Sequence, residues 1–480
     1  MCGCTICCSV EALYTGCMPQ WISTAFFCIA IFSASSYAWA QDNLTLEQRA
    51  RQYLIDLLRI DTSSPPGNET RAAEYLKKTT AAYGISSELL GGDPSRLNFV
   101  ARLRGDGSKG RPLLLMAHTD VVPVDRGQWT VEPFAGLVRD GYIYGRGAQD
   151  DKCFLAAELA VFVELKRRNV NLGRDVIFLA ESGEEGTSDV GVRWMIRNAY
   201  DEINAEFALN EGGFNAKLPS GVQLFHIQTS EKVPTRVVLT AHGSAGHGSI
   251  PRPDNPVAHL ARALDRLVST DESVQLNETT RRYFRAIAKT DDYKWLEPLL
   301  AGLENPKTAV AAANQIRAKN AELDAALRTT LSPTMLKAGF RVNVIPNTAE
   351  AQIDVRRLPT ETREEVYNRF RRIMNDPSID ISPAGLDRPA TEPSSMSTAL
   401  YKTMESVFQK AHPRALVIPY MQHGATDGAD LRAKGMAVYG VPLFDESENR
   451  LHGNDERIGV ANFEKGAGLL WQIVTAVAGQ

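Results

Sequence analysis

Two periods of apolar residues recur along the chain, and they predict where its helices and strands lie. Helical spacing of apolar residues occurs in three early segments, namely residues 45–60, 69–83 and 153–168. Short apolar runs bounded by Gly or Pro occur at residues 98–103, 112–117 and 175–180, and these predict strands. Strands that alternate with helices in this way indicate an α/β fold with a mostly parallel sheet flanked by helices.

The pattern changes in the middle of the chain. Two further strands are expected at residues 233–241 and 341–355, each followed by a helix, at 256–267 and 362–374. Residues 277–335 between them are rich in Ala, Leu, Lys and Glu and are expected to be almost all helical. Helix and strand alternate again after a Pro- and Ser-rich stretch at 391–395. We therefore expect an α/β domain made of residues 41–231 and 391–480, interrupted by a smaller α+β domain at 232–390 with a helical insert at about 272–338.

The N-terminal segment has the features of an export signal. An apolar run at residues 21–32 is followed by small residues and then by Ala38-Trp39-Ala40. Such a run before an A-x-A-like site is typical of a cleavable signal peptide, here residues 1–40, which predicts export to the periplasm or the outside of the cell. The alternative is an uncleaved anchor, and translation from Met18 is an alternative start. No later stretch is long and apolar enough to span a bilayer, so no stable membrane span is expected after processing.

Cysteine usage agrees with this prediction. Of the seven cysteines, only Cys153 lies beyond the predicted signal peptide, so the mature chain is expected to hold no internal disulfide. We expect Cys153 to be a buried, inert thiol, because no signature of a Cys/His pair surrounds it.

Composition places the chain among ordinary globular proteins. Of the 480 residues, 44% are hydrophobic and 23% are charged, which suits a protein with a large core. The 53 basic and 57 acidic residues nearly balance, at a net charge of -4, and no long basic run is present. Nucleic acid is therefore not expected as a partner.

Several His and carboxylate side chains follow the predicted strands, where metal ligands often lie. His118 ends the apolar run at 113–117 and is followed by Thr119-Asp120. The other motifs are Gly145-Arg146-Gly147-Ala148-Gln149-Asp150-Asp151-Lys152, Glu181-Ser182-Gly183-Glu184-Glu185-Gly186, Glu211-Gly212-Gly213 and Leu451-His452-Gly453. Taken singly, each has a structural alternative: a His that caps a strand, a turn with a solvated helix N-cap, or surface charge.

The order of these motifs resembles that of the di-zinc metallopeptidases that include aminoacylase, carboxypeptidase S, succinyl-diaminopimelate desuccinylase and glutamate carboxypeptidase. The resemblance covers nearly the whole mature chain and is strongest to the carboxypeptidase S-like branch. It rests further on His118-Thr119-Asp120-Val121-Val122-Pro123-Val124, on Trp129 with Pro133-Phe134, and on Asp140-Gly141-Tyr142-Ile143-Tyr144-Gly145-Arg146-Gly147. It implies that the α/β domain is catalytic and that residues 232–390 form a lid or dimerisation domain.

The resemblance also implies a role for each site residue. One zinc is expected on His118 and Glu211 and a second on Glu185 and His452, with Asp150 bridging both and a cis peptide bond after it. Asp120 is expected to orient His118. Glu184 is expected to be the general base, which takes a proton from water and passes it to the leaving nitrogen.

The lid contributes further candidates through the same resemblance. His247, in the run Ala241-His242-Gly243-Ser244-Ala245-Gly246-His247-Gly248, corresponds to the family's oxyanion donor, which in dimeric relatives reaches the partner's active site. Asn343 is expected to contact substrate, and Arg356 to hold the substrate carboxylate; for Arg356 a surface salt bridge is the alternative. The block Gly424-Ala425-Thr426-Asp427 departs from the family, because Ala429 stands where an Arg is usual. Whether Arg432 compensates is left open by the sequence.

The function expected from the sequence is hydrolysis of an amide or peptide bond next to a free carboxylate, as a carboxypeptidase or an N-acyl-amino-acid deacylase performs it. Two zinc ions are the expected cofactors, with cobalt or manganese as alternatives. The expected substrates are small peptides or N-acyl amino acids, and a homodimer is one assembly that the resemblance allows. The rival hypotheses are an aminopeptidase or dipeptidase on the same metal core and a catalytically dead binding protein. The presence of Glu184 argues against the last of these.

Overall fold

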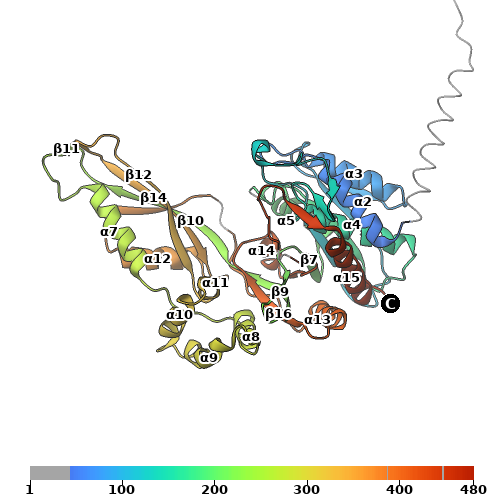
Figure 1. Ribbon diagram of the computed structural model, residues 1–480. Coiled ribbons are helices and arrows are strands. Elements are labelled where there is room, and N and C mark those ends of the chain that lie inside the picture. Colours follow the sequence, from blue (N-terminus) through green and yellow to red (C-terminus); the bar gives the residue numbers. More distant parts are fainter. Residues whose placement is uncertain (1–43, 187, 386–387, 446–447) are drawn as a thin grey trace, which may run out of the picture. The chain divides into compact units, whose positions relative to one another are not determined.

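The computed structural model describes residues 44–186, 188–385, 388–445 and 448–480 (Figure 1). The predicted signal peptide at residues 1–40 therefore lies outside the described residues. No helix within the described ranges combines the length and the apolar character that crossing a membrane requires.

A nine-stranded mixed sheet forms the centre of the fold, with the strand order β1-β2-β6-β3-β7-β17-β9-β16 and with β8 paired to β9. Its strands are β1 (Ser87–Leu90), β2 (Asn98–Leu103), β3 (Leu113–His118), β6 (Val176–Glu181), β7 (Phe207–Asn210), β8 (Phe214–Lys217), β9 (Gln223–Glu231), β16 (Leu416–Gln422) and β17 (Ala437–Gly440). The central strands β6, β3, β7 and β17 run parallel to one another. The three strands expected from the first apolar runs are confirmed as β2, β3 and β6.

Helices cover both faces of this sheet, as the continuous apolar strands require. The helices are α2 (Leu46–Leu58), α3 (Thr70–Ala81), α4 (Lys152–Arg167), α5 (Val192–Asn198), α6 (Tyr200–Ile203), α13 (Ala399–Ala411), α14 (Gly428–Arg432) and α15 (Val460–Ala478). The side chains of successive residues in β3 point to opposite faces of the sheet. Leu113 and Leu115 join the core under α2, α4 and α15, whereas Leu114 and Met116 join the core under α5 and α14. The predicted helices at 45–60, 69–83 and 153–168 are confirmed as α2, α3 and α4, and Cys153 is buried in α4.

A second, four-stranded sheet has its own apolar core. Its order is β12-β14-β10-β15, formed by β10 (Val233–His242), β12 (Thr330–Ala338), β14 (Thr348–Arg357) and β15 (Ile379–Pro383). Helices α7 (Pro256–Ser269) and α12 (Arg363–Met374) bury Leu260 and Phe370 against it. The strand predicted at 341–355 forms later than expected, because residues 344–345 pair as the short β13 (Val344–Ile345) with β11 (Gly246–His247) instead. The strands of the four-stranded sheet all lie in the predicted lid segment, and those of the nine-stranded sheet all lie in the predicted catalytic domain. The domain boundaries themselves stay a prediction.

The helical insert is shorter than the sequence indicated. Helices α8 (Glu278–Ile287), α9 (Glu297–Glu304), α10 (Ala309–Arg317) and α11 (Ala321–Ala325) occupy its first part. The expectation that helix continues to residues 335–338 is wrong, because β12 pairs there with β14 from Thr330 to Ala338. Pro333, at a register irregularity in β12, is tolerated because β12 lies at the edge of its sheet.

A small three-stranded sheet joins two distant parts of the chain. It has the order β18-β5-β4 and consists of β4 (Leu137–Arg139), β5 (Tyr142–Tyr144) and β18 (Arg457–Gly459). Arg457 pairs with Tyr144 in this sheet. The pairing brings the loop that carries His452 beside the loop that carries Asp150.

Candidate metal centre

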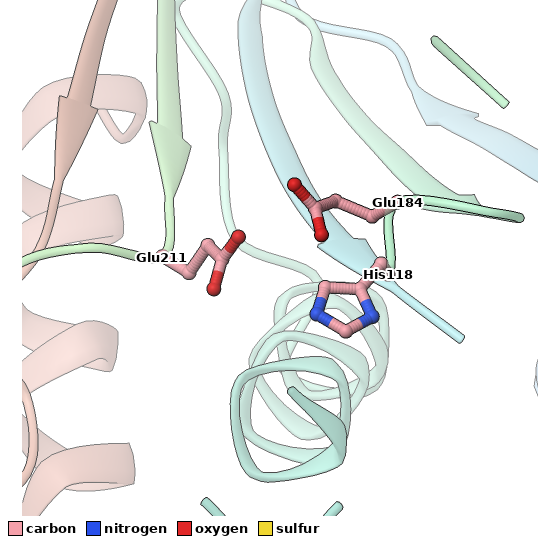
Figure 2. Close-up of side chains that lie close together, drawn as sticks. All are labelled: His118, Glu184 and Glu211. Carbon is pink, nitrogen blue, oxygen red and sulfur yellow. The ribbon is translucent and has the colours of Figure 1, made fainter. Parts of the chain in front are cut away.

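Four of the predicted site residues lie where three neighbouring parallel strands end. His118 is the last residue of β3, and Glu211 directly follows β7. Glu184 and Glu185 lie in the loop after β6. Because β6, β3 and β7 are adjacent and parallel, their carboxyl ends meet at one edge of the sheet. Figure 2 shows the side chains of His118, Glu184 and Glu211 facing one another at this edge.

Among the residues that the structure describes, two groups of donor atoms are close enough to hold metal ions. One group consists of His118, Glu184 and Glu211, and the other of His118, Asp150 and Glu185. Within each group the donor atoms all lie within 4.8 Å of one another. Imidazole nitrogens with carboxylate oxygens are a donor set that suits Zn²⁺ and similar divalent cations.

Asp150 lies between the two histidines of the site. Its Oδ1 is 3.0 Å from His118 Nε2, and its Oδ2 is 3.0 Å from His452 Nε2. His452 Nε2 is also 3.0 Å from Glu185 Oε1. The peptide bond after Asp150 is cis. One carboxylate that faces two imidazoles through its two oxygens has the geometry expected of a bridging ligand, although the role of each residue stays a prediction.

Burial and like charge dominate the electrostatics of the carboxylates. Burial, together with the nearby charge of Asp427, raises the pKa of Glu184 well above its ordinary value. Burial and the charge of Asp150 do the same to the pKa of Glu211. Several buried carboxylates in one place are stable in the charged form only beside cations, so the site is electrostatically suited to divalent metal ions.

The two histidines have the opposite effect on Asp150. Burial opposes its ionisation, but hydrogen bonds to His118 and His452 outweigh burial and lower the pKa of Asp150. Hydrogen bonds to Asp150 and Glu185 raise the pKa of His452 to about 10. His452 has a left-handed backbone, with φ of 59°, which is uncommon for a residue other than Gly and is often found at functional sites.

Asp120 organises the loop that carries Glu184 and Glu185. Its carboxylate accepts the backbone N–H groups of Gly183 at 2.9 Å, Glu184 at 3.1 Å and Glu185 at 3.2 Å. His118 Nδ1 is 2.9 Å from the backbone carbonyl of Asp120 but 3.6 Å from its carboxylate. Asp120 thus contacts Nδ1 through its carbonyl, with its carboxylate also within ion-pair distance, and an Nδ1–H that donates to the carbonyl leaves Nε2 free to bind a cation.

Glu456 is a site residue that the sequence did not single out. Its carboxylate accepts the backbone N–H groups of Gly147 at 3.1 Å, Gln149 at 2.7 Å and Asp150 at 3.1 Å. It also forms a buried ion pair with Arg146 at 2.6 Å. Glu456 thus fixes the loop that presents Asp150. Its position four residues after His452 is the sequence feature that could have drawn attention to it.

The lid candidates make their contacts within the lid segment. His247 and Asn343 are brought together, since His247 pairs with Val344 and the carbonyl of Asn343 accepts the N–H of Gly248 at 2.8 Å. His247 Nδ1 contacts Ser249 within its own loop, at 2.7 Å. Arg356 forms an ion pair with Asp354 at 2.8 Å. This is the salt bridge that was the alternative interpretation of this residue.

Arg432, whose role the sequence left open, is engaged in buried contacts. The guanidinium of Arg432 is buried, 3.2 Å from Glu231, and it donates to Ser394 Oγ and to the carbonyl of Val438, both at 3.3 Å. Ala429 is also buried. Arg432 therefore links α14 to Glu231, Ser394 and β17.

Comparison with protein families agrees with the resemblance seen in the sequence. The family model described as Peptidase family M20/M25/M40 matches residues 114–476. Among curated proteins, the human N-fatty-acyl-amino acid synthase/hydrolase PM20D1 is 27% identical over 437 residues, covering 88% of this chain and 85% of its own length. Aminoacylase-1 from Sus scrofa is 26% identical, covering 89% of this chain and 94% of its own length. Probable carboxypeptidase S-like 2 from Dictyostelium discoideum is 28% identical, with coverage of 77% and 73%.

Solved structures share the fold. An M20 family metallo-carboxypeptidase, Sso-CP2 from Sulfolobus solfataricus, superposes with a TM-score of 0.65 at 21% identity, covering 88% of this chain and 98% of that one. The YXEP protein of Bacillus subtilis, described as a dinuclear metal binding peptidase, has a TM-score of 0.59 at 15% identity, with coverage of 90% and 98%. These structures confirm the predicted fold class.

Proposed function

We propose that this chain, which belongs to peptidase family M20/M25/M40, hydrolyses an amide or peptide bond next to a free carboxylate. The proposed reaction takes place at a centre of two zinc ions. The observation that carries the proposal is Asp150, whose two oxygens each lie 3.0 Å from a histidine, His118 on one side and His452 on the other. Glu184 lies in the same cluster.

The chemistry follows from these positions. A pair of zinc ions, when bound, would lower the pKa of a water and polarise the substrate carbonyl. Glu184 takes the proton of the attacking water and passes it to the leaving nitrogen. Asp120 fixes the backbone of Glu184, and Glu456 fixes that of Asp150, so the base and the bridging ligand are held in place before substrate arrives.

The free carboxylate in the proposal is supported by the names of the relatives. They include an N-fatty-acyl-amino acid synthase/hydrolase, an aminoacylase and a carboxypeptidase S-like protein. Carboxypeptidases and aminoacylases both cut an amide bond whose nitrogen belongs to an amino acid with a free carboxylate. Asn343 and Arg356 are proposed to contact this part of the substrate, and His247 to stabilise the oxyanion.

A homodimer is part of the proposal. The outer edge of the lid sheet carries exposed apolar side chains on and after β12, where Met335 is 59%, Leu336 is 69% and Phe340 is 84% exposed. An edge strand with exposed apolar side chains favours association with another chain. Sedimentation of the purified protein tests this: a dimer is expected, and a monomer at micromolar concentration contradicts it.

Export is proposed on the sequence alone. The apolar run at residues 21–32 and the site Ala38-Trp39-Ala40 support cleavage before Gln41. N-terminal sequencing of the protein recovered from cell fractions tests it. Gln41 as first residue of the periplasmic or secreted protein is expected, and an uncleaved chain in the membrane fraction contradicts it.

A substrate panel tests the proposed activity. Purified mature protein is assayed with N-acyl amino acids, with their amidated counterparts that lack the free carboxylate, and with free-N-terminal dipeptides, with and without a chelator. We expect the protein to hydrolyse the N-acyl amino acids, and we expect a chelator to abolish this activity and zinc to restore it. Preference for the amidated compounds contradicts the carboxylate rule. Activity confined to dipeptides with a free amine favours the aminopeptidase or dipeptidase alternative.

A further inference from the structure

Arg388 connects the end of the lid segment with the candidate base. It follows β15 in the chain and precedes α13. Its Nη2 donates to Glu184 Oε1 at 3.2 Å, and its Nη1 donates to Asp427 Oδ1 at 3.0 Å and to the carbonyl of Thr426. The side chain is only 15% exposed. Nothing in the sequence motifs singled out this residue.

The surroundings of Arg388 are strongly acidic. Asp430 lies 3.8 Å from its guanidinium, in addition to the contacts with Glu184 and Asp427. Position 429, two residues after Asp427, carries an uncharged Ala, and Arg432 is engaged with Glu231 instead. Among the described residues, Arg388 is the one basic side chain within ion-pair distance of Glu184.

Glu184 is therefore held at two points. Asp120 accepts its backbone N–H at 3.1 Å, and Arg388 donates to its carboxylate. In this orientation the carboxylate faces His118 and Glu211 (Figure 2). A general base works only within hydrogen-bond reach of the proton that it takes, and small displacements of a catalytic group cost rate. The planar guanidinium is suited to the task, because it can donate to several oxygens at once in a fixed geometry.

We propose that Arg388 is a positioning residue for Glu184, which acts by fixing the orientation of the base carboxylate. The proposal rests on the proposed function, since it requires that Glu184 is the base. It assigns to Arg388 a role in the rate of the chemical step. A role in binding the substrate carboxylate is a different prediction, because that role would change KM.

The test compares Arg388→Gln and Arg388→Lys with the unmodified chain. Arg388→Gln is expected to lower kcat by about 10²-fold with KM within about twofold, because the base is present but misplaced. Arg388→Lys, which keeps one donor and the charge, is expected to recover part of this loss. Both variants are expected to bind the same number of zinc ions as the unmodified protein. Arg432→Lys is the matched control, since Arg432 is also a buried Arg but contacts Glu231, and its kcat is expected to stay within about twofold of the unmodified value.

Crystal structures of the metal-free proteins give a readout that does not depend on activity. Glu184 is expected to turn away from His118 and Glu211 in Arg388→Gln and to keep its orientation in Arg432→Lys. The proposal is overturned if Glu184 keeps its orientation in Arg388→Gln, if kcat is unchanged, if KM alone rises, or if zinc is lost. If Arg388→Gln does not fold, the same comparison is made with Arg388→Lys, for which an unchanged kcat and an unmoved Glu184 overturn it. A failure of the proposed function looks different, because the unmodified protein then hydrolyses no amide while the crystallographic comparison still reports on Glu184.

Discussion

The carboxylate of Glu456 accepts a hydrogen bond from the backbone N–H of Asp150, at 3.1 Å, although 306 positions separate the two residues. The same carboxylate forms a buried ion pair with Arg146. The loop that carries His452 and the loop that carries Asp150 are thus fixed to each other before any cation binds, and Asp150 is held between the two histidines.

Replacement of Glu456 tests this relationship. Glu456→Gln is expected to weaken zinc binding by about 10–100-fold, because a group that orients a metal ligand is lost. It is also expected to lower the free energy of unfolding by about 3–5 kcal/mol, because Arg146 is left buried without its partner. Zinc affinity by competition with a chromogenic chelator and unfolding in denaturant measure the two effects. Glu448→Gln is the control, since Glu448 pairs with Arg457 at the surface of the same region and its loss should leave zinc affinity unchanged.

Glu184 and Asp150 are expected to fail in opposite ways. Glu184→Gln should retain zinc and lower kcat by about 10²–10⁴-fold, because the proton acceptor is removed. Asp150→Asn should lose zinc, because the shared ligand then carries no charge. Zinc per chain, measured by elemental analysis beside kcat, separates the two. Loss of zinc in Glu184→Gln would show that Glu184 is a ligand rather than the base.

Asp120 offers a test of the loop after β6. Its carboxylate accepts hydrogen bonds from three consecutive backbone N–H groups. In Asp120→Asn one carboxylate oxygen becomes an NH₂ group, which cannot accept these hydrogen bonds. Zinc affinity is expected to fall by about 10–100-fold and kcat to fall with it, because Glu184 and Glu185 both shift. Thr119→Val is the control. It removes a buried hydroxyl that donates to the carbonyl of Glu181, at a cost of about 1 kcal/mol in stability and with no change in zinc affinity.

His226 is expected to make the protein less stable in acid. It is 3% exposed and stacks on Phe214, with ring centroids 4.1 Å apart. Burial lowers the pKa of His226 to about 4 from its ordinary 6.5. Between these values the unfolded chain takes up a proton that the folded chain does not, so the stability from this residue is complete above about pH 6.5 and falls as pH drops toward 4.

The shift corresponds to about 3 kcal/mol. His226→Leu, which cannot take up a proton, is expected to remove this part of the acid destabilisation. Unfolding of chelator-treated protein, measured from pH 7 to pH 4.5, shows the difference without a contribution from zinc release. Equal acid slopes for His226→Leu and the unmodified protein would contradict the prediction.

The sequence was sufficient to predict the core elements, because strands and helices buried on a whole face have strong periodicity. The strands β2, β3 and β6 and the helices α2 and α4 follow from apolar runs alone. The strand β12 was missed because its outer edge is exposed and its composition resembles that of the preceding helices. Only its pairing with β14 makes it a strand.

The site could be predicted as far as residue types at strand ends reveal it. His118, Asp150, Glu184 and Glu211 each lie at or near the end of a strand or the start of a helix, where the motif order identified them. Glu456 and Arg388 contact site residues hundreds of positions away, as Arg388 does Glu184 at 204 positions. The closeness of Glu456 to His452 in the sequence is a weak local signal, and no local pattern marks Arg388. The contact of His118 with the carbonyl of Asp120 is likewise set by the loop geometry.

The proposed metal centre requires Asp150 to bridge two cations, between His118 and His452. Anomalous diffraction at the zinc absorption edge, from a crystal of the zinc-loaded protein, tests it most directly. Two peaks about 3.5–4 Å apart are expected, with one oxygen of Asp150 bound to each. A single peak, or two peaks that Asp150 does not touch, would contradict the account.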